Sequence, residues 1–169
     1  SNGGGMYLRE SSPTLTNITI IGNTGSNGGG MYLRESSPTL TNVTISENGE
    51  ELTYYITGKG GGMYISSSNP NLMDVTISGN MAIKGAGMYL ASSNATLTNV
   101  TVVNNTSTLN IFGDSDGGGI YLTDSNPSLT NVDIVNNVAS FGAGIYISAN
   151  SNPTLTDVTI SENTADYGG

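Results

Sequence analysis

The sequence predicts an all-β fold in which one chain winds into a solenoid of about six coils, each holding three short strands. Residues 1–25 and 26–50 agree at 20 of 25 positions, which identifies an internal repeat. Glycine-rich openings recur at intervals of 25, 32, 25, 32, 25 and 26 residues. Apolar residues alternate with period two between Gly, Asn, Ser and Pro, a pattern typical of strands. A strand pattern at this period predicts stacked coils that contact only their neighbours.

The two interval lengths indicate that alternate coils carry an insertion. The 32-residue coils add seven residues near 50–56 and 107–113, after the last strand of the coil. A single domain therefore spans 1–169, with coils at 3–27, 28–59, 60–84, 85–116, 117–141 and 142–167.

Each coil is predicted to contain three strands in a fixed order. In the second coil, Met31 and Leu33 point inward and Tyr32 points outward. A second strand follows the Ser-Ser-Pro turn with Leu40 inward. The alternation then shifts by one residue, which requires a bend at Asn42, because Asn tolerates left-handed backbone geometry. A third strand completes the coil, so five apolar side chains per coil stack into one core.

Two polar columns accompany the apolar ones, and we expect their side chains to hydrogen-bond along the solenoid as amide ladders. Carbohydrate binding by either column is the alternative. The column at the bend consists of Asn17, Asn42, Asp74, Asn99, Asn131 and Asp157. The column after the last strand consists of Asn23, Asn48, Asn80, Asn105, Asn137 and Asn163.

Charge and composition exclude several classes of partner. Thirteen acidic residues against four basic ones give a net charge of −9, which argues against a face for nucleic acid or for a membrane surface. No apolar run is long enough to span a membrane, so we expect no membrane insertion. The chain contains no Cys and no His.

The repeat resembles the right-handed parallel β-helix repeats of bacterial surface and secreted proteins, the non-enzymatic, adhesin-like members of the pectate-lyase-like fold. The matching residues are the Gly-Gly-Gly-Met/Ile-Tyr openings, segments such as 38–45, and the Ile-Ser-x-Asn endings such as 160–163. The resemblance covers essentially the whole chain. It implies a right-handed winding and an extracellular or cell-surface location.

We expect no catalytic site and no cofactor. The basic residues Arg9 and Arg34 occupy equivalent repeat positions, as do Lys59 and Lys84, so they are interpreted as copied surface residues rather than catalysts. A calcium loop containing Asp114 and Asp116 is the weak alternative, since it lacks the third acid and the distal Glu of an EF-hand.

The most regular outward feature is an unbroken column of tyrosines. The rings either pack on one another and cover the turns, or form a strip that binds sugar or a second chain. The column consists of Tyr7, Tyr32, Tyr64, Tyr89, Tyr121 and Tyr146.

Outward threonine pairs such as Thr39 and Thr41 resemble the Thr-x-Thr array of ice-binding solenoids, so ice binding is a lesser alternative. Asn71 and Met73 interrupt the array in the third coil.

Apolar residues in the insertions need a covering partner, either a satellite core or another chain. They are Leu52, Tyr54, Tyr55, Leu109, Ile111 and Phe112.

The sequence therefore predicts an extracellular structural or adhesive segment that acts as a stiff rod, fibre or filament subunit. Its expected partners are copies of itself stacked end to end, or flanking coils of a longer chain, because a solenoid without capping segments exposes strand edges. A carbohydrate-binding or carbohydrate-active β-helix that uses the tyrosine column is the alternative.

Overall fold

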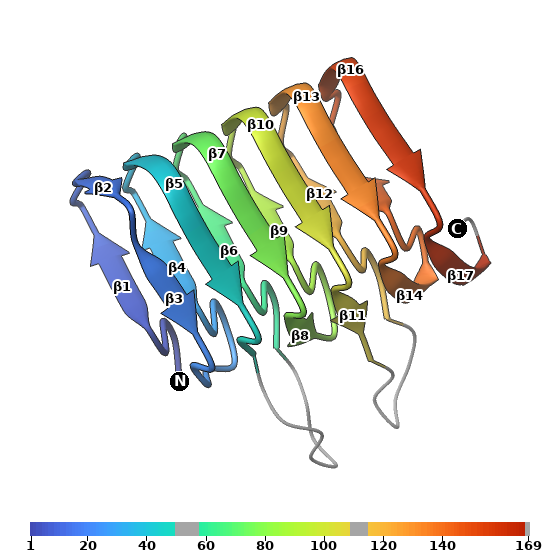
Figure 1. Ribbon diagram of the computed structural model, residues 1–169, viewed down its shortest axis with the longest axis horizontal. Coiled ribbons are helices and arrows are strands. Elements are labelled where there is room, and N and C mark those ends of the chain that lie inside the picture. The colour runs from blue at the N-terminus through green and yellow to red at the C-terminus, as the bar shows by residue number, and fades with distance from the viewer. Residues whose placement is uncertain (50–57, 109–114, 168–169) are drawn as a thin grey trace.

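The computed structural model describes residues 1–49, 58–108 and 115–167, and these residues form three parallel sheets that run side by side along a solenoid (Figure 1). Equivalent residues of successive coils pair directly, for example Met31 with Met63 and Met63 with Met88. The all-β fold and the stacked parallel coils are confirmed.

The tyrosine sheet contains the strand that opens each coil, and its register keeps every tyrosine opposite the next one. Its strands are β1 (Met6–Arg9), β4 (Met31–Arg34), β6 (Met63–Ser66), β9 (Met88–Ala91), β12 (Ile120–Thr123) and β15 (Ile145–Ser148).

The long sheet joins what the sequence suggests as second and third strands. From the second coil on, these two segments form one eight-residue strand with a left-handed residue in its middle, such as Asn42 at φ 51°. Pairing continues on both sides because every coil bends at the same place. The strands are β2 (Thr14–Thr16), β3 (Thr19–Ile21), β5 (Thr39–Ser46), β7 (Asn71–Ser78), β10 (Thr96–Val103), β13 (Ser128–Val135) and β16 (Thr154–Ser161).

The third sheet, called the short sheet, lies in a part of the coil for which the sequence predicts no strand. Its strands follow the second asparagine column and have two to four residues, too few to show a periodic pattern. They are β8 (Met81–Ala82), β11 (Thr106–Ser107), β14 (Val138–Phe141) and β17 (Thr164–Tyr167).

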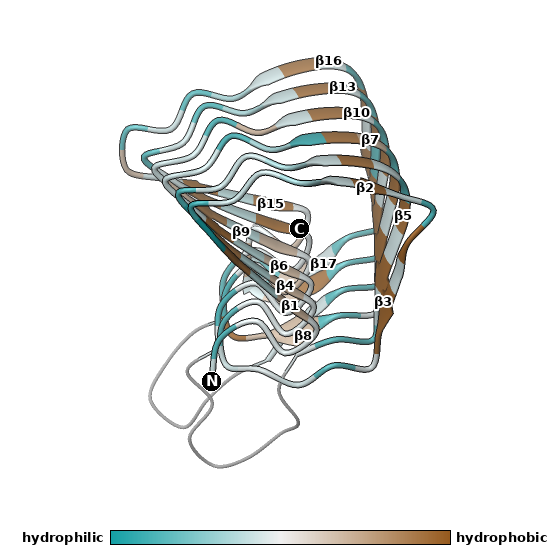
Figure 2. Ribbon diagram, turned by 90° about the vertical axis from the view of Figure 1, so that its left-hand side faces the viewer, coloured by the Kyte–Doolittle hydropathy of each residue, from teal (hydrophilic) through white to brown (hydrophobic). Residues whose placement is uncertain are grey.

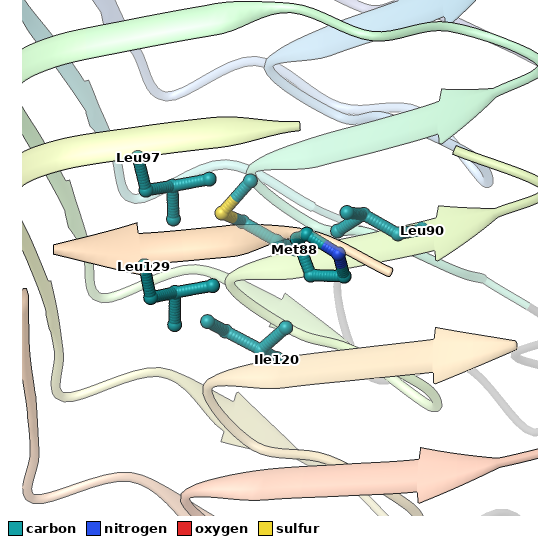
Figure 3. A pocket seen from close by; sticks show the side chains of 6 residues that line it. Met88, Leu90, Leu97, Ile120 and Leu129 are labelled. Atoms are coloured by element: carbon teal, nitrogen blue, oxygen red, sulfur yellow. The ribbon is translucent and has the colours of Figure 1, made fainter. Parts of the chain in front are cut away.

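The three sheets enclose a dry apolar core, seen from the end of the stack in Figure 2. Inward side chains of the middle coils, such as Met63 and Leu72, are fully buried. Between Met88, Leu97 and Ile120 no space remains for a water molecule (Figure 3). The interiors of globular proteins are close-packed in the same way.

The coil closes through four corners, each made by a residue with positive φ. In the second coil these are Gly28, Glu35, Asn42 and Glu47. A left-handed non-glycine residue costs roughly 1–2 kcal/mol, so the corners depend on the core and the ladders that the coils share.

Candidate functional site

The column after the long sheet is a buried asparagine ladder that runs through all six coils. The Asn80 Nδ2 donates to Asn105 Oδ1 at 2.9 Å and to the Ile45 carbonyl at 3.0 Å. The Asn80 Oδ1 accepts from the backbone N and the Nδ2 of Asn48, at 2.9 and 3.1 Å. The Asn80 side chain is almost fully buried. Its amide has no capacity left for a ligand, so this column is structural.

A strictly glycine column packs against this ladder. A Cβ on Gly62 would lie 2.6 Å from the Gly87 carbonyl oxygen and 3.0 Å from the Asn80 Nδ2. A Cβ on Gly87 would lie 3.1 Å from the Asn105 Nδ2. The neighbouring glycine column instead contains Ala86, which is fully buried. Backbone carbonyls and the buried amides thus leave no room for a Cβ at Gly62, while the neighbouring column has alanine in some coils.

The column at the bend is an exposed ladder of the opposite polarity. The Asn42 Nδ2 donates back to Asn17 Oδ1 at 2.7 Å, and the Asn99 Nδ2 donates back to Asp74 at 3.0 Å. A carboxylate has no hydrogen to donate, so Asp74 accepts from the following coil and gives nothing to the preceding one. Every residue in this column has positive φ. Its first function is therefore to make the bend.

The tyrosine rings stack face to face along the whole tyrosine sheet. Adjacent ring centroids lie 4.8 to 5.2 Å apart, with interplanar angles of 3° to 11°. Tyr7 is 46% exposed, whereas Tyr89 and Tyr121 are only 6% and 9% exposed. Each inner ring has both faces covered by neighbouring rings. The column thus presents ring edges and phenol hydroxyls, in the way expected of rings that pack on one another.

Two lysines cover the most buried part of this column. The Lys59 Nζ lies 5.1 Å from the centroid of the Tyr89 ring, and the Lys84 Nζ lies 5.4 Å from that of Tyr121. Both distances are within the range of cation–π attraction. Burial, with the neighbouring rings of Tyr121 and Tyr64, raises the pKa of Tyr89 to about 12.

An ion pair joins the third and fourth coils beside these rings. The Lys84 Nζ donates to Asp116 Oδ2 at 2.5 Å, and the Asp116 side chain is almost buried. Burial lowers the pKa of Lys84, the hydrogen bond to Asp116 and its charge raise it, and the net pKa lies above the ordinary lysine value. Asp116, one of the two residues of the predicted calcium loop, is thus already paired with the Lys84 ammonium group. Asp114 lies outside the described residues. Among the described residues, no group of three or more acidic side chains could hold a metal ion.

The comparison with protein families decides the classification. The model of the right-handed β-helix region matches residues 1–165. The chain belongs to the right-handed β-helix family. The right-handed winding expected from the resemblance is therefore confirmed. A search of curated proteins finds no match to this β-helix.

The threonine face of the long sheet, the candidate for ice binding, is interrupted by Met73, whose side chain is 40% exposed. The described part of the chain holds no helix long and apolar enough to cross a membrane. The apolar insertion residues lie outside the described residues: Leu52, Tyr54, Tyr55, Leu109, Ile111 and Phe112.

A third ladder, of serines, was not expected from the sequence. The backbone N of Ser68 donates to Ser93 Oγ at 3.1 Å, and the backbone N of Ser93 donates to Ser125 Oγ at 3.0 Å. The Ser93 Oγ donates to the Ala91 carbonyl at 2.8 Å. The signal was available, because one serine lies four residues after each of the first five column tyrosines and Ser151 lies five residues after Tyr146. Hydrogen-bonded ladders therefore connect each coil of the β-helix to the next at several points around its circumference.

Proposed function

We propose that this β-helix is a non-enzymatic structural rod of the cell surface or extracellular space, which serves as a stiff spacer or fibre segment. The observation that carries the proposal is the buried asparagine ladder. Hydrogen bonds between its side-chain amides join every coil to the next without interruption. A load along the axis would be shared by these bonds, by three sheets and by the core. The resemblance to surface and secreted β-helix repeats supports the location.

The basic side chains support a non-enzymatic role. Arg9 contacts its neighbour Glu10 at 3.2 Å, and Arg34 contacts Glu35 at 3.3 Å, in matching exposed pairs. Lys84 is held by Asp116. The two arginines repeat the same local arrangement in successive coils, whereas a catalytic group stands at one unique place.

Ring stacking on a glycan is disfavoured by the geometry of the tyrosine column. A sugar that stacks on an aromatic residue needs an open ring face, and the inner rings have both faces covered by other tyrosines. An adhesive role would have to use ring edges and phenol hydroxyls, for which the half-buried Tyr32 and Tyr64 are the inner candidates. A glycan array with the wild-type chain and Tyr64→Ser tests this role, and a ligand lost in the variant would support it.

Single-molecule pulling from the two ends tests the rod proposal. The wild-type chain should resist unfolding and then open in a few large cooperative steps, because neighbouring coils share their contacts. Asn105→Ala should lower the unfolding force, whereas Asn99→Ala, on the exposed ladder, should change it little. A wild-type chain that peels open one coil at a time at low force would contradict a load-bearing role.

A further inference from the structure

The tyrosine column hides the faces of its rings and exposes their reactive edges. The rings of Tyr32 and Tyr64 stack at 4.9 Å with an interplanar angle of 3°, and both side chains are half-buried. Their outer edges carry the phenol oxygen and the two carbons beside it, which are the atoms where a tyrosyl radical reacts. We propose that Tyr32 and Tyr64 are sites of oxidative coupling, at which dityrosine bonds join two copies of this β-helix side by side. This inference rests on the proposed structural role and specifies how such rods are cross-linked.

The reaction requires an oxidant, for which the proposal names hydrogen peroxide used by a peroxidase. Each phenol gives up one electron and one proton and becomes a neutral radical. Two radicals join through a carbon beside each oxygen, and the hydrogen on each of these carbons then moves to the oxygen, which restores both phenols. The peroxide accepts both electrons and both protons and forms water. Burial, with the neighbouring Tyr32, raises the pKa of Tyr64, so this phenol is neutral at neutral pH and loses its proton only as it is oxidised.

Stacking prevents the same bond from forming between neighbours of one column. A dityrosine bond joins two ring edges, whereas Tyr32 and Tyr64 meet face to face, as do Tyr64 and Tyr89 at 5.2 Å. The strand register holds these rings in place, because the residues that carry them pair directly across the sheet. The open ring edges of two separate columns have no such restriction. Coupling should therefore join different molecules.

Two lysines protect the more buried members of the column. Tyr89 and Tyr121 are only 6% and 9% exposed, and each has a lysine ammonium group close to its ring. The side chain of Lys59 limits the access of an oxidant to Tyr89. Its positive charge also opposes the loss of an electron from the ring. Both effects make Tyr89 and Tyr121 poor sites for oxidation, in contrast to Tyr32 and Tyr64.

One residue in each coil decides whether a tyrosine is protected. Lys59 ends the second coil and lies over Tyr89 of the fourth coil. Its partner in the preceding coil is Asn27, and the same offset assigns Asn27 to Tyr64. The Asn27 side chain is shorter, and its Nδ2 donates backward to Asn2 Oδ1 at 3.0 Å. Among the described residues, no lysine therefore lies over the Tyr64 ring.

The first experiment treats the chain with a peroxidase and hydrogen peroxide and separates the products by denaturing gel electrophoresis. A parent variant keeps only the inner column tyrosines, and Phe, which preserves the ring without the phenol, replaces Tyr7, Tyr54, Tyr55, Tyr146 and Tyr167. This parent should form covalent dimers and longer multimers with dityrosine fluorescence. Adding Tyr32→Phe and Tyr64→Phe should abolish the multimers. Adding Tyr89→Phe and Tyr121→Phe instead is the matched control and should leave them unchanged.

The second experiment tests protection by lysine in the variant that retains only Tyr89 and Tyr121. Lys59→Asn introduces the residue type found at the equivalent position of the preceding coil, and it should restore coupling through Tyr89. Lys59→Arg is the control and should not restore it, because the guanidinium keeps the positive charge. Mass spectrometry of cross-linked peptides from the wild-type chain identifies the sites without any substitution. It should find Tyr32 and Tyr64, and neither Tyr89 nor Tyr121.

Several results would overturn the inference. They are a parent variant that stays monomeric, equal losses in the two double variants, and a dityrosine bond that links Tyr32 to Tyr64 within one chain. Failure of Lys59→Asn to restore coupling would refute the protective role of the lysine. A chain that resists force in the pulling experiment but does not couple would refute this inference and leave the structural role standing, and a chain that couples but peels open at low force would do the reverse. Circular dichroism of each variant verifies that the sheets are retained.

Discussion

Replacing one amide of the buried ladder should destabilise the protein far more than the same change on the exposed ladder. Asn80→Ala removes four side-chain hydrogen bonds of 2.9 to 3.1 Å. It leaves the backbone N–H and one Nδ2 hydrogen of Asn48 buried without partners. At about 1–3 kcal/mol for each of these two unsatisfied buried groups, the free energy of unfolding should fall by roughly 2–6 kcal/mol.

The matched control is Asn99→Ala, which removes two hydrogen bonds that water can replace. Its expected cost is about 1 kcal/mol, mainly because Ala is disfavoured at the positive φ of this residue. Urea denaturation followed by circular dichroism measures both variants, and an unchanged slope with denaturant would show that the cooperative unit is retained. Equal losses in the two variants would refute the claim that the buried amides hold the coils together.

Three further predictions concern the glycines, the ion pair and the tyrosines. Gly62→Ala should lower the melting temperature more than Gly25→Ala, because a Cβ on Gly62 would lie 2.6 Å from the Gly87 carbonyl oxygen, whereas a Cβ on Gly25 would lie no closer than 3.1 Å to its nearest neighbour. Lys84→Ala should cost roughly 2–3 kcal/mol, less than a fully buried pair because the ammonium is partly exposed; adding Asp116→Asn should recover most of it in urea denaturation. Stability should decrease as pH rises from 10 toward 12, because unfolded tyrosine ionises near 10 but the pKa of folded Tyr89 is about 12; Tyr89→Phe should flatten this dependence, and an unchanged slope would contradict it.

The sequence predicts the fold well where the pattern is periodic and poorly where it is not. Met31, Tyr32 and Leu33 alternate, and the structure buries the first and third of them while the second lies outward. The short strand Val138–Phe141 has no such alternation. Its pairing depends on the neighbouring coil, which no local pattern records.

The surroundings of the tyrosine column depend on contacts between coils. Lys59 ends the second coil but lies over Tyr89 of the fourth coil, so the strand pattern around Tyr89 does not reveal which side chain covers it. The pairing of Lys84 with Asp116 could have been found by aligning the residue that precedes each glycine triplet, since the two occupy adjacent members of that column. Their ion pair follows from the register and not from spacing within one coil.

The uniform register of the sheets has a consequence for how such a protein changes in length. Because each coil contacts the next through equivalent residues, a pair of coils can be gained or lost without any new kind of contact between coils. Each gain or loss would alter the span by about 10 Å, from two strand spacings of roughly 4.8 Å. The length of the solenoid is thus set by its number of coils, independently of which residues are exposed on its sides.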